Sequence, residues 1–111
     1  MKDSIKIVEE MYPQTAAEFK AMTDDMYKVF CDKMYDYGAN NIALGRDLED
    51  EHNKKMSLMG IWFRSNDKMS RIENLLQRKD DAVNESLEDS YLDLANYSVI
   101  ASIVRKNLWG K

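Results

Sequence analysis

Apolar residues recur at intervals of three and four along most of this chain, and no segment alternates apolar with polar residues as a half-buried strand would. The clearest run follows a Thr15–Glu18 capping box and ends before Gly38, a natural C-terminal cap. Its apolar members are Phe19, Met22, Met26, Val29, Phe30, Met34 and Tyr37. This pattern predicts a long helix over residues 15–37 and restricts the chain to an all-α fold.

Three further segments have the same helical character. The first stops before Pro13, which favours a helix boundary. The third predicted helix is weakened in its middle by Gly60 and by residues 65–67, Ser-Asn-Asp, so a kink or a break is expected there. Residues 38–47 contain two glycines and an asparagine pair and predict a loop. The predicted helices are therefore residues 4–11, 15–37, 48–78 and 83–107.

A chain of 111 residues has the length of one ordinary domain. We therefore expect a single helical domain over residues 1–111. The simplest architecture is an antiparallel helical bundle of three long helices plus a short N-terminal helix.

Composition excludes several classes of function. The net charge of −4, from 16 basic and 20 acidic residues, argues against binding to duplex nucleic acid. The longest uncharged stretch, residues 94–104, is too short to cross a membrane, and the N-terminus has no apolar signal core. Cys31 and His52 each stand alone, so a disulfide, a Cys/His zinc site and a His-based triad are not expected. A cytoplasmic protein is predicted.

The first candidate site is an acidic ladder in the last predicted helix. Glu85, Asp89, Asp93 and Asn96 fall at roughly 0, 40, 80 and 20° around a helix that turns about 100° per residue. Like charges stacked one turn apart repel, so we expect a cation to neutralise them. That cation is either a metal, with Mg²⁺ or Mn²⁺ suited to carboxylate oxygens, or the basic side chains of a neighbouring helix.

A basic stripe provides the second candidate. Arg64, Lys68 and Arg71 are spaced by four and three residues on the third predicted helix. If the last two helices are antiparallel, Lys68 and Arg71 lie opposite the middle of the ladder. The stripe then either neutralises the acids or binds phosphate oxygens. A simple surface pair of Arg71 with Asp67 is also open.

Two groups of residues have weaker signals. Asp36 and Tyr37 precede Gly38, where a carboxylate faces the unfavourable negative end of the helix dipole. This placement marks Asp36 as a candidate, although it can equally point to solvent. Tyrosines could stack on a base, although aromatic residues at helical spacing more often belong to a core; they are Tyr35, Tyr37, Tyr91 and Tyr97.

Together these motifs resemble a known family. KMYDYGANN contains Asp36-Tyr37-Gly38, KMSRIENL contains Lys68, Arg71 and Ile72, and NESLEDSYLDLANYSVIA contains the ladder with Asn96 and Tyr97. Over about residues 30–103, this order resembles nucleotide modification associated domain 1, a family of bacteriophages and bacteria. That family is thought to be related to the all-α MazG-like nucleotide pyrophosphohydrolases.

The resemblance implies a helical bundle that handles a nucleotide. MazG-type enzymes use a metal-activated water to convert a nucleoside triphosphate to a monophosphate and pyrophosphate. Carried over, Glu85, Asp89 and Asp93 would hold Mg²⁺, with Asp89 and Asp93 as catalytic residues. The remaining candidates would bind phosphates or orient the nucleotide; they are Arg64, Lys68, Arg71, Asn96, Tyr97, Asp36 and Tyr37. Relatives complete their sites between subunits, which implies a homo-oligomer.

The chain departs from the MazG pattern in two ways. MazG-type sites draw carboxylates from two helices, with a Glu-Glu-x-x-Glu run on the first, and no segment of this chain reproduces that run. The acids of the ladder are also spaced by four residues and not by three. Three hypotheses are therefore open: a Mg²⁺-dependent hydrolase of a (deoxy)nucleoside triphosphate or modified nucleotide, a non-enzymatic nucleotide-binding protein, and a helical protein-interaction module.

Overall fold

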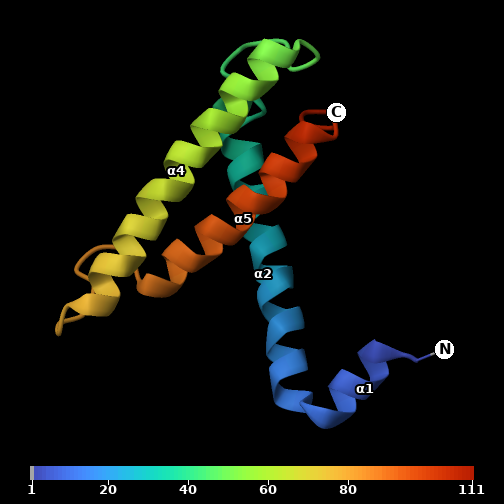
Figure 1. The fold of residues 1–111 in the computed structure, drawn as a ribbon, viewed down its shortest axis with the longest axis vertical. Helices are drawn as coiled ribbons and strands as arrows, with labels where there is room; N and C mark the ends of the chain where they lie inside the picture. Colours follow the sequence, from blue (N-terminus) through green and yellow to red (C-terminus); the bar gives the residue numbers. More distant parts are fainter. Residues whose placement is uncertain (1) are drawn as a thin grey trace. The chain divides into compact units, whose positions relative to one another are not determined.

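The fold is all-α, as predicted. The computed structural model describes residues 2–111, and in that range it contains five helices and no strand (Figure 1). The helices are α1 (Ser4–Met11), α2 (Pro13–Tyr37), α3 (Asn40–Ala43), α4 (Glu51–Gln77) and α5 (Leu87–Arg105).

The chain divides into two compact units, one ending at Lys33 and the other running from Met34 to Lys111. The first unit holds α1 and most of α2, and neither helix has a buried residue among those described. Asp3 caps α1 by accepting a hydrogen bond of 3.2 Å from the Lys6 backbone N–H. The second long helix begins at Pro13, two residues before the predicted capping box. Proline suits a first helical position because its missing N–H would have no partner there.

Helix α4 is one continuous helix, so the expected break is absent. Its N-cap is Asp50, whose carboxylate accepts a 3.0 Å hydrogen bond from the Asn53 backbone N–H. In the middle of the helix, Ser65 donates its hydroxyl proton to the Ile61 carbonyl at 2.9 Å. This bond satisfies the serine hydroxyl within its own helix.

Helix α5 begins at Leu87, four residues later than the sequence predicted. Ser86 is the N-cap and accepts a 3.2 Å hydrogen bond from the Asp89 backbone N–H. Residues before Ser86 form the turn after α4, where the Arg78 side chain donates to the Asp80 carbonyl at 3.2 Å and to the Asp81 carbonyl. The Arg78 side chain therefore satisfies two carbonyls of the turn between α4 and α5.

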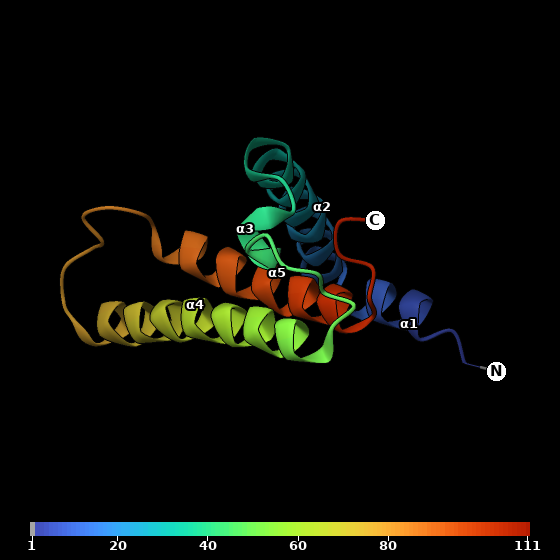
Figure 2. The same ribbon diagram turned by 90° about the horizontal axis from the view of Figure 1, so that it is seen from above.

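The core of the second unit lies where α4, α5 and α3 meet. Helices α4 and α5 run antiparallel and side by side, and α3 packs against α4 (Figures 1 and 2). Ser57 on α4 is buried and donates a 2.9 Å hydrogen bond to the Ile42 carbonyl of α3. The buried apolar residues are Ile42, Ala43, Ile61, Ile72, Ile100 and Val104. The α4–α5 pair of the predicted bundle is thus present, and the packing of α2 as a third long member stays a prediction.

None of the helices in residues 2–111 combines the length and apolarity needed to cross a membrane.

Candidate functional site

Lys68 is the central cation of the face between α4 and α5. We call this surface the Lys68 face, and its residues are Arg64, Lys68, Arg71, Glu85, Asp93, Asn96 and Tyr97. The Lys68 Nζ lies 2.9 Å from Asp93 Oδ2 and 3.6 Å from Glu85 Oε2. The side chains of Lys68 and Asp93 are only 20% and 15% exposed, whereas that of Glu85 is 59% exposed. The Lys68–Asp93 pair is therefore the half-buried, strong contact, and Glu85 adds a weaker one from the solvent side.

The pKa of the Lys68 ammonium is raised above its ordinary value. The main cause is the hydrogen bond to Asp93, followed in the same direction by the charges of Asp93 and Glu85 and by Tyr97. Partial burial acts in the opposite direction, because it disfavours a charge, but it does not prevail. Lys68 is thus held firmly in its charged form.

The acidic ladder is not one continuous helical stripe. Glu85 precedes the N-cap of α5, so its predicted position on the helix is wrong. Asp89 is exposed in the first turn of α5, where a carboxylate is favourable beside the positive end of the helix dipole. Only Asp93 points a half-buried carboxylate at the basic stripe. The three acids have three different environments, so they do not act as equivalent ligands.

Arg71 links α4 to the beginning of α5 through hydrogen bonds. One guanidinium nitrogen, Nη1, donates to the Ser90 Oγ at 2.6 Å and to the Ser86 carbonyl at 3.2 Å. The other, Nη2, donates to the Glu85 carbonyl. Ser90 is fully buried, so this contact ties α4 to the beginning of α5 from within. The position of Arg71 opposite the ladder matches the prediction, whereas its serine and carbonyl partners had no signal in the sequence.

Arg64 lies one turn before Lys68 on the same face of α4. Its Nη2 donates a 3.0 Å hydrogen bond to the Asn41 carbonyl of α3, and the side chain is half-buried. Arg64 and Lys68 therefore form a pair of cations beside the junction of three helices. The contribution of Asn41 was missed in the sequence because a backbone carbonyl of a predicted loop has no side-chain signature.

The remaining predicted residues divide into two places. Asn96 and Tyr97 are half-buried on α5, and Tyr97 is close enough to Lys68 to influence the pKa of that ammonium. Asp36 and Tyr37 are exposed at the end of α2, next to Gly38, whose φ of 71° confirms the predicted cap. Within residues 2–111, no hydrogen bond or ion pair joins Asp36 or Tyr37 to the Lys68 face.

The ladder does not fit a divalent metal within one chain. Asp93 and Glu85 both face the Lys68 ammonium, while Asp89, one turn before Asp93 on α5, is exposed. Among residues 2–111, no group of three or more His, Cys, Asp or Glu side chains is arranged to hold a metal ion. Lys68 on α4 is the cation that neutralises Asp93 and Glu85.

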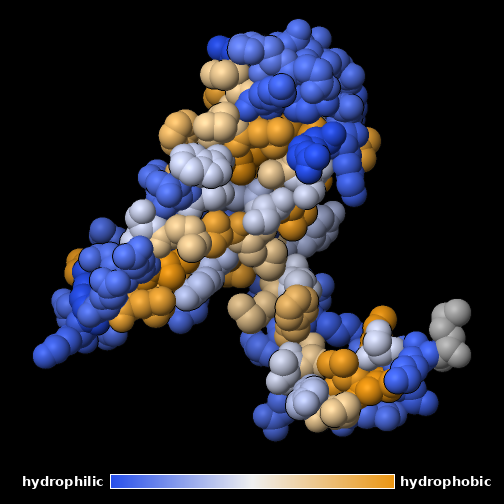
Figure 3. All heavy atoms as spheres, viewed as in Figure 1, coloured by the Kyte–Doolittle hydropathy of each residue, from blue (hydrophilic) through white to orange (hydrophobic). Residues whose placement is uncertain are grey.

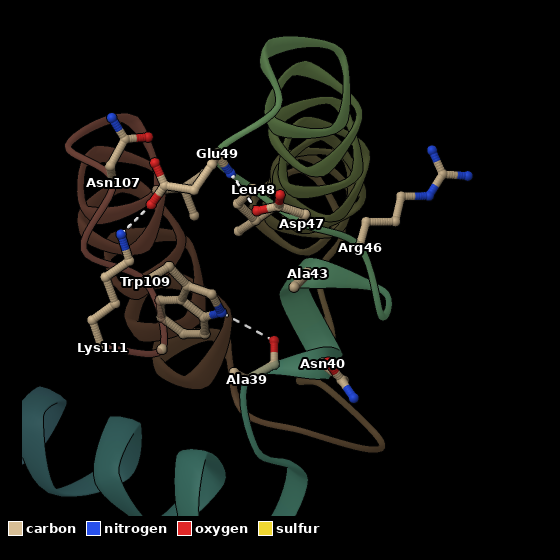
Figure 4. A pocket seen from close by; sticks show the side chains of 12 residues that line it. Ala39, Asn40, Ala43, Arg46, Asp47, Leu48, Glu49, Asn107, Trp109 and Lys111 are labelled. Atoms are coloured by element: carbon tan, nitrogen blue, oxygen red, sulfur yellow. Dashed lines mark hydrogen bonds and ion pairs between the residues drawn. The ribbon is translucent and has the colours of Figure 1, made fainter.

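A separate cavity of about 270 Å³ lies between the α3–α4 loop and the C-terminal turn. Trp109 forms one wall and donates its indole N–H to the Ala39 carbonyl at 3.0 Å, while Lys111 pairs with Glu49 across the opening (Figure 4). Arg46 points away from the cavity in this view. No sequence pattern predicted this cavity, because it joins residues that are 70 positions apart.

The comparisons with known proteins identify one family. A family model described as nucleotide modification associated domain 1 matches residues 33–104, a range that holds every residue of the Lys68 face. No curated protein matches the chain, and no solved structure does.

Proposed function

Because the chain belongs to the nucleotide modification associated domain 1 family, we propose that it binds a nucleotide through the phosphates. The observation that carries this proposal is the pair of cations, Arg64 and Lys68, on one face of α4 inside the matched range. A guanidinium and an ammonium one turn apart present donors to two phosphate oxygens at once.

Both cations have capacity left for an anion. Arg64 uses only Nη2 in its bond to Asn41, and its other guanidinium nitrogens make no hydrogen bond within residues 2–111. Glu85 meets Lys68 at 3.6 Å through an exposed carboxylate. A phosphate group with a higher charge can displace Glu85 and leave the shorter Lys68–Asp93 pair in place.

Asp93 would then act as a positioning residue. It holds the Lys68 ammonium in place at 2.9 Å and keeps it charged, and neither role needs a metal. Asn96 and Tyr97 lie on the same half-buried part of α5 and would contact the sugar or the base. A relationship to MazG-type enzymes, hydrolysis to a monophosphate and pyrophosphate, and a role for Mg²⁺ stay predictions of the resemblance.

A thermal-shift screen of the nucleoside triphosphates and deoxynucleoside triphosphates, each with and without Mg²⁺, tests the proposal. We expect at least one nucleotide to raise the melting temperature without Mg²⁺, because the cations are the chain's own. Chromatography of the nucleotide after incubation then shows whether it returns unchanged or as a monophosphate. If no nucleotide shifts the melting temperature under either condition, the proposal is wrong.

Substitutions locate the binding site. Arg64→Ala should weaken binding about tenfold or more, because it removes a charged donor to phosphate. Arg46→Ala is the matched control, since Arg46 is an exposed arginine at the separate cavity. Loss of binding in Arg46→Ala with full binding in Arg64→Ala would contradict the Lys68 face as the binding site.

A further inference from the structure

Helix α4 carries a second apolar surface that no described residue buries. We call it the outer stripe, and its main members are Met59, Trp62, Met69 and Leu76, with Met56 and Phe63 along one edge. Their exposed fractions range from 43% to 62%. Figure 3 shows hydrophobic residues at the surface of the α4–α5 pair between two hydrophilic ends.

The outer stripe has the spacing of a coiled-coil seam. Trp62, Met69 and Leu76 are seven residues apart, and Met59 begins a second series of the same interval that continues with Asn66 and Glu73. The six residues of these two series fall within roughly 100° of the helix circumference. The buried residues Ile61 and Ile72 lie on a different face, roughly a third of a turn away. Helix α4 thus has one apolar face that packs in its own core and a second apolar face that is exposed.

The size of the outer stripe is that of an interface. At about half of the roughly 200 Å² that a large apolar side chain carries, the six apolar members expose roughly 600 Å². That equals the largest patch found on typical monomers, and neighbouring polar residues bring it close to the roughly 800 Å² that each partner buries in a stable complex.

We propose that the outer stripe pairs with the outer stripe of a second copy of this chain, antiparallel and about a two-fold axis. In this register Met59 faces Leu76 of the second copy, Trp62 faces Glu73, and Asn66 faces Met69. The axis passes beside the bond between residues 67 and 68. Each of these three contacts is then formed twice, which closes the assembly at two chains.

Charge selects the antiparallel direction. In a parallel pair identical residues meet, so Glu73 would face Glu73, and Lys55, which extends the stripe by one turn, would face Lys55. In the antiparallel pair Lys55 meets the acidic turn after α4 of the second copy, where Asp80 and Asp81 are exposed. Glu73 lies beside the Trp62 ring with its carboxylate free to reach water. This pairing is independent of nucleotide binding, because no residue of the Lys68 face belongs to the stripe.

Sedimentation equilibrium over about 1 to 200 µM protein tests the assembly, and we expect a dimer. Met69→Glu should raise the dimer dissociation constant at least about a hundredfold, because it buries a charge at the contact next to the axis. Val99→Glu is the matched control: Val99 is 53% exposed on α5, outside the stripe, and its variant should stay dimeric. Circular dichroism checks that each variant is folded, and Leu76→Lys replaces Met69→Glu if that variant is not.

Cross-linking tests the direction. In a Cys31→Ser background, Met59→Cys and Leu76→Cys should cross-link with each other in a mixture of the two variants. Neither should cross-link with itself, because like positions lie roughly 25 Å apart along an antiparallel pair. A monomeric wild-type protein, an equal effect of Val99→Glu, or a cross-link of Met59→Cys with itself would each overturn the proposal.

Discussion

At the scale of single residues, the site depends on how one ammonium is shared. Lys68 meets a half-buried carboxylate at 2.9 Å and an exposed one at 3.6 Å. The sequence predicted that the acidic ladder and the basic stripe would face each other. It left open whether a metal ion or the basic stripe would neutralise the carboxylates. Spacing could not decide this, because the answer depends on where α5 begins, and the Ser86 cap excludes Glu85 from the helix.

The two aspartates of the ladder should differ in their effect on stability. Asp93→Asn removes the carboxylate charge beside a partly buried ammonium and leaves only the more distant charge of Glu85, so we expect a loss of about 2 kcal/mol in the free energy of unfolding. Asp89→Asn removes only a favourable interaction with the helix dipole, about 0.5 kcal/mol. Urea unfolding at neutral pH measures both variants. Equal losses would contradict the different environments assigned to these residues.

The raised pKa of Lys68 predicts a dependence of stability on alkaline pH. Because the pKa is higher in the folded state, this contribution is fully present below the unfolded value of about 10.4 and is lost as pH rises through the folded pKa. Urea midpoints of the wild type and of Lys68→Met between about pH 9 and 11.5 provide the measurement. The difference between them should shrink as pH rises, because the wild type loses the Lys68 charge that the variant lacks throughout. A constant difference would show that the ammonium is not stabilised in the fold.

At the scale of elements, the beginning of α5 is held by the neighbouring helix. Ser86 caps the helix by itself, and Arg71 of α4 reaches the Ser86 and Glu85 carbonyls and the buried Ser90 hydroxyl. The sequence pattern extended the helix to Val83, because periodicity describes which face is apolar and does not reveal a side chain that binds carbonyls from another helix.

Arg71 should therefore matter more for folding than for nucleotide binding. We expect Arg71→Met to reduce the free energy of unfolding by about 3 kcal/mol, because it leaves the buried Ser90 hydroxyl and two carbonyls without their charged donor. Arg78→Met is the control, since Arg78 binds only groups of its own turn, the Asp80 and Asp81 carbonyls and the exposed Asp80 carboxylate. It should cost less than about 1 kcal/mol. Thermal unfolding of both variants provides the comparison. A large loss of nucleotide affinity in a stable Arg71→Met protein would instead restore the role that the sequence suggested.

At the scale of the whole molecule, periodicity predicted the helices well and their packing only in part. The all-α fold, the short first helix and the antiparallel α4–α5 pair follow from apolar spacing and short connections. The chain's division after Lys33 does not, because Phe19 and Met22 have the spacing of core residues and yet are exposed. A pattern shows that a face is apolar, but it does not show what covers that face. The outer stripe of α4 was hidden in the sequence for the same reason, mixed with the residues of the inner core.

The hydrogen bond from Trp109 to the Ala39 carbonyl has a consequence for how the protein is made. It joins positions 70 residues apart, and Val104, the most buried apolar residue, lies in the same late part of the chain. During synthesis α3 and most of α4 therefore leave the ribosome before the residues that complete their core have emerged. The second unit can fold only after nearly all of its chain has been translated, so its buried serines and isoleucines stay accessible to chaperones until that moment.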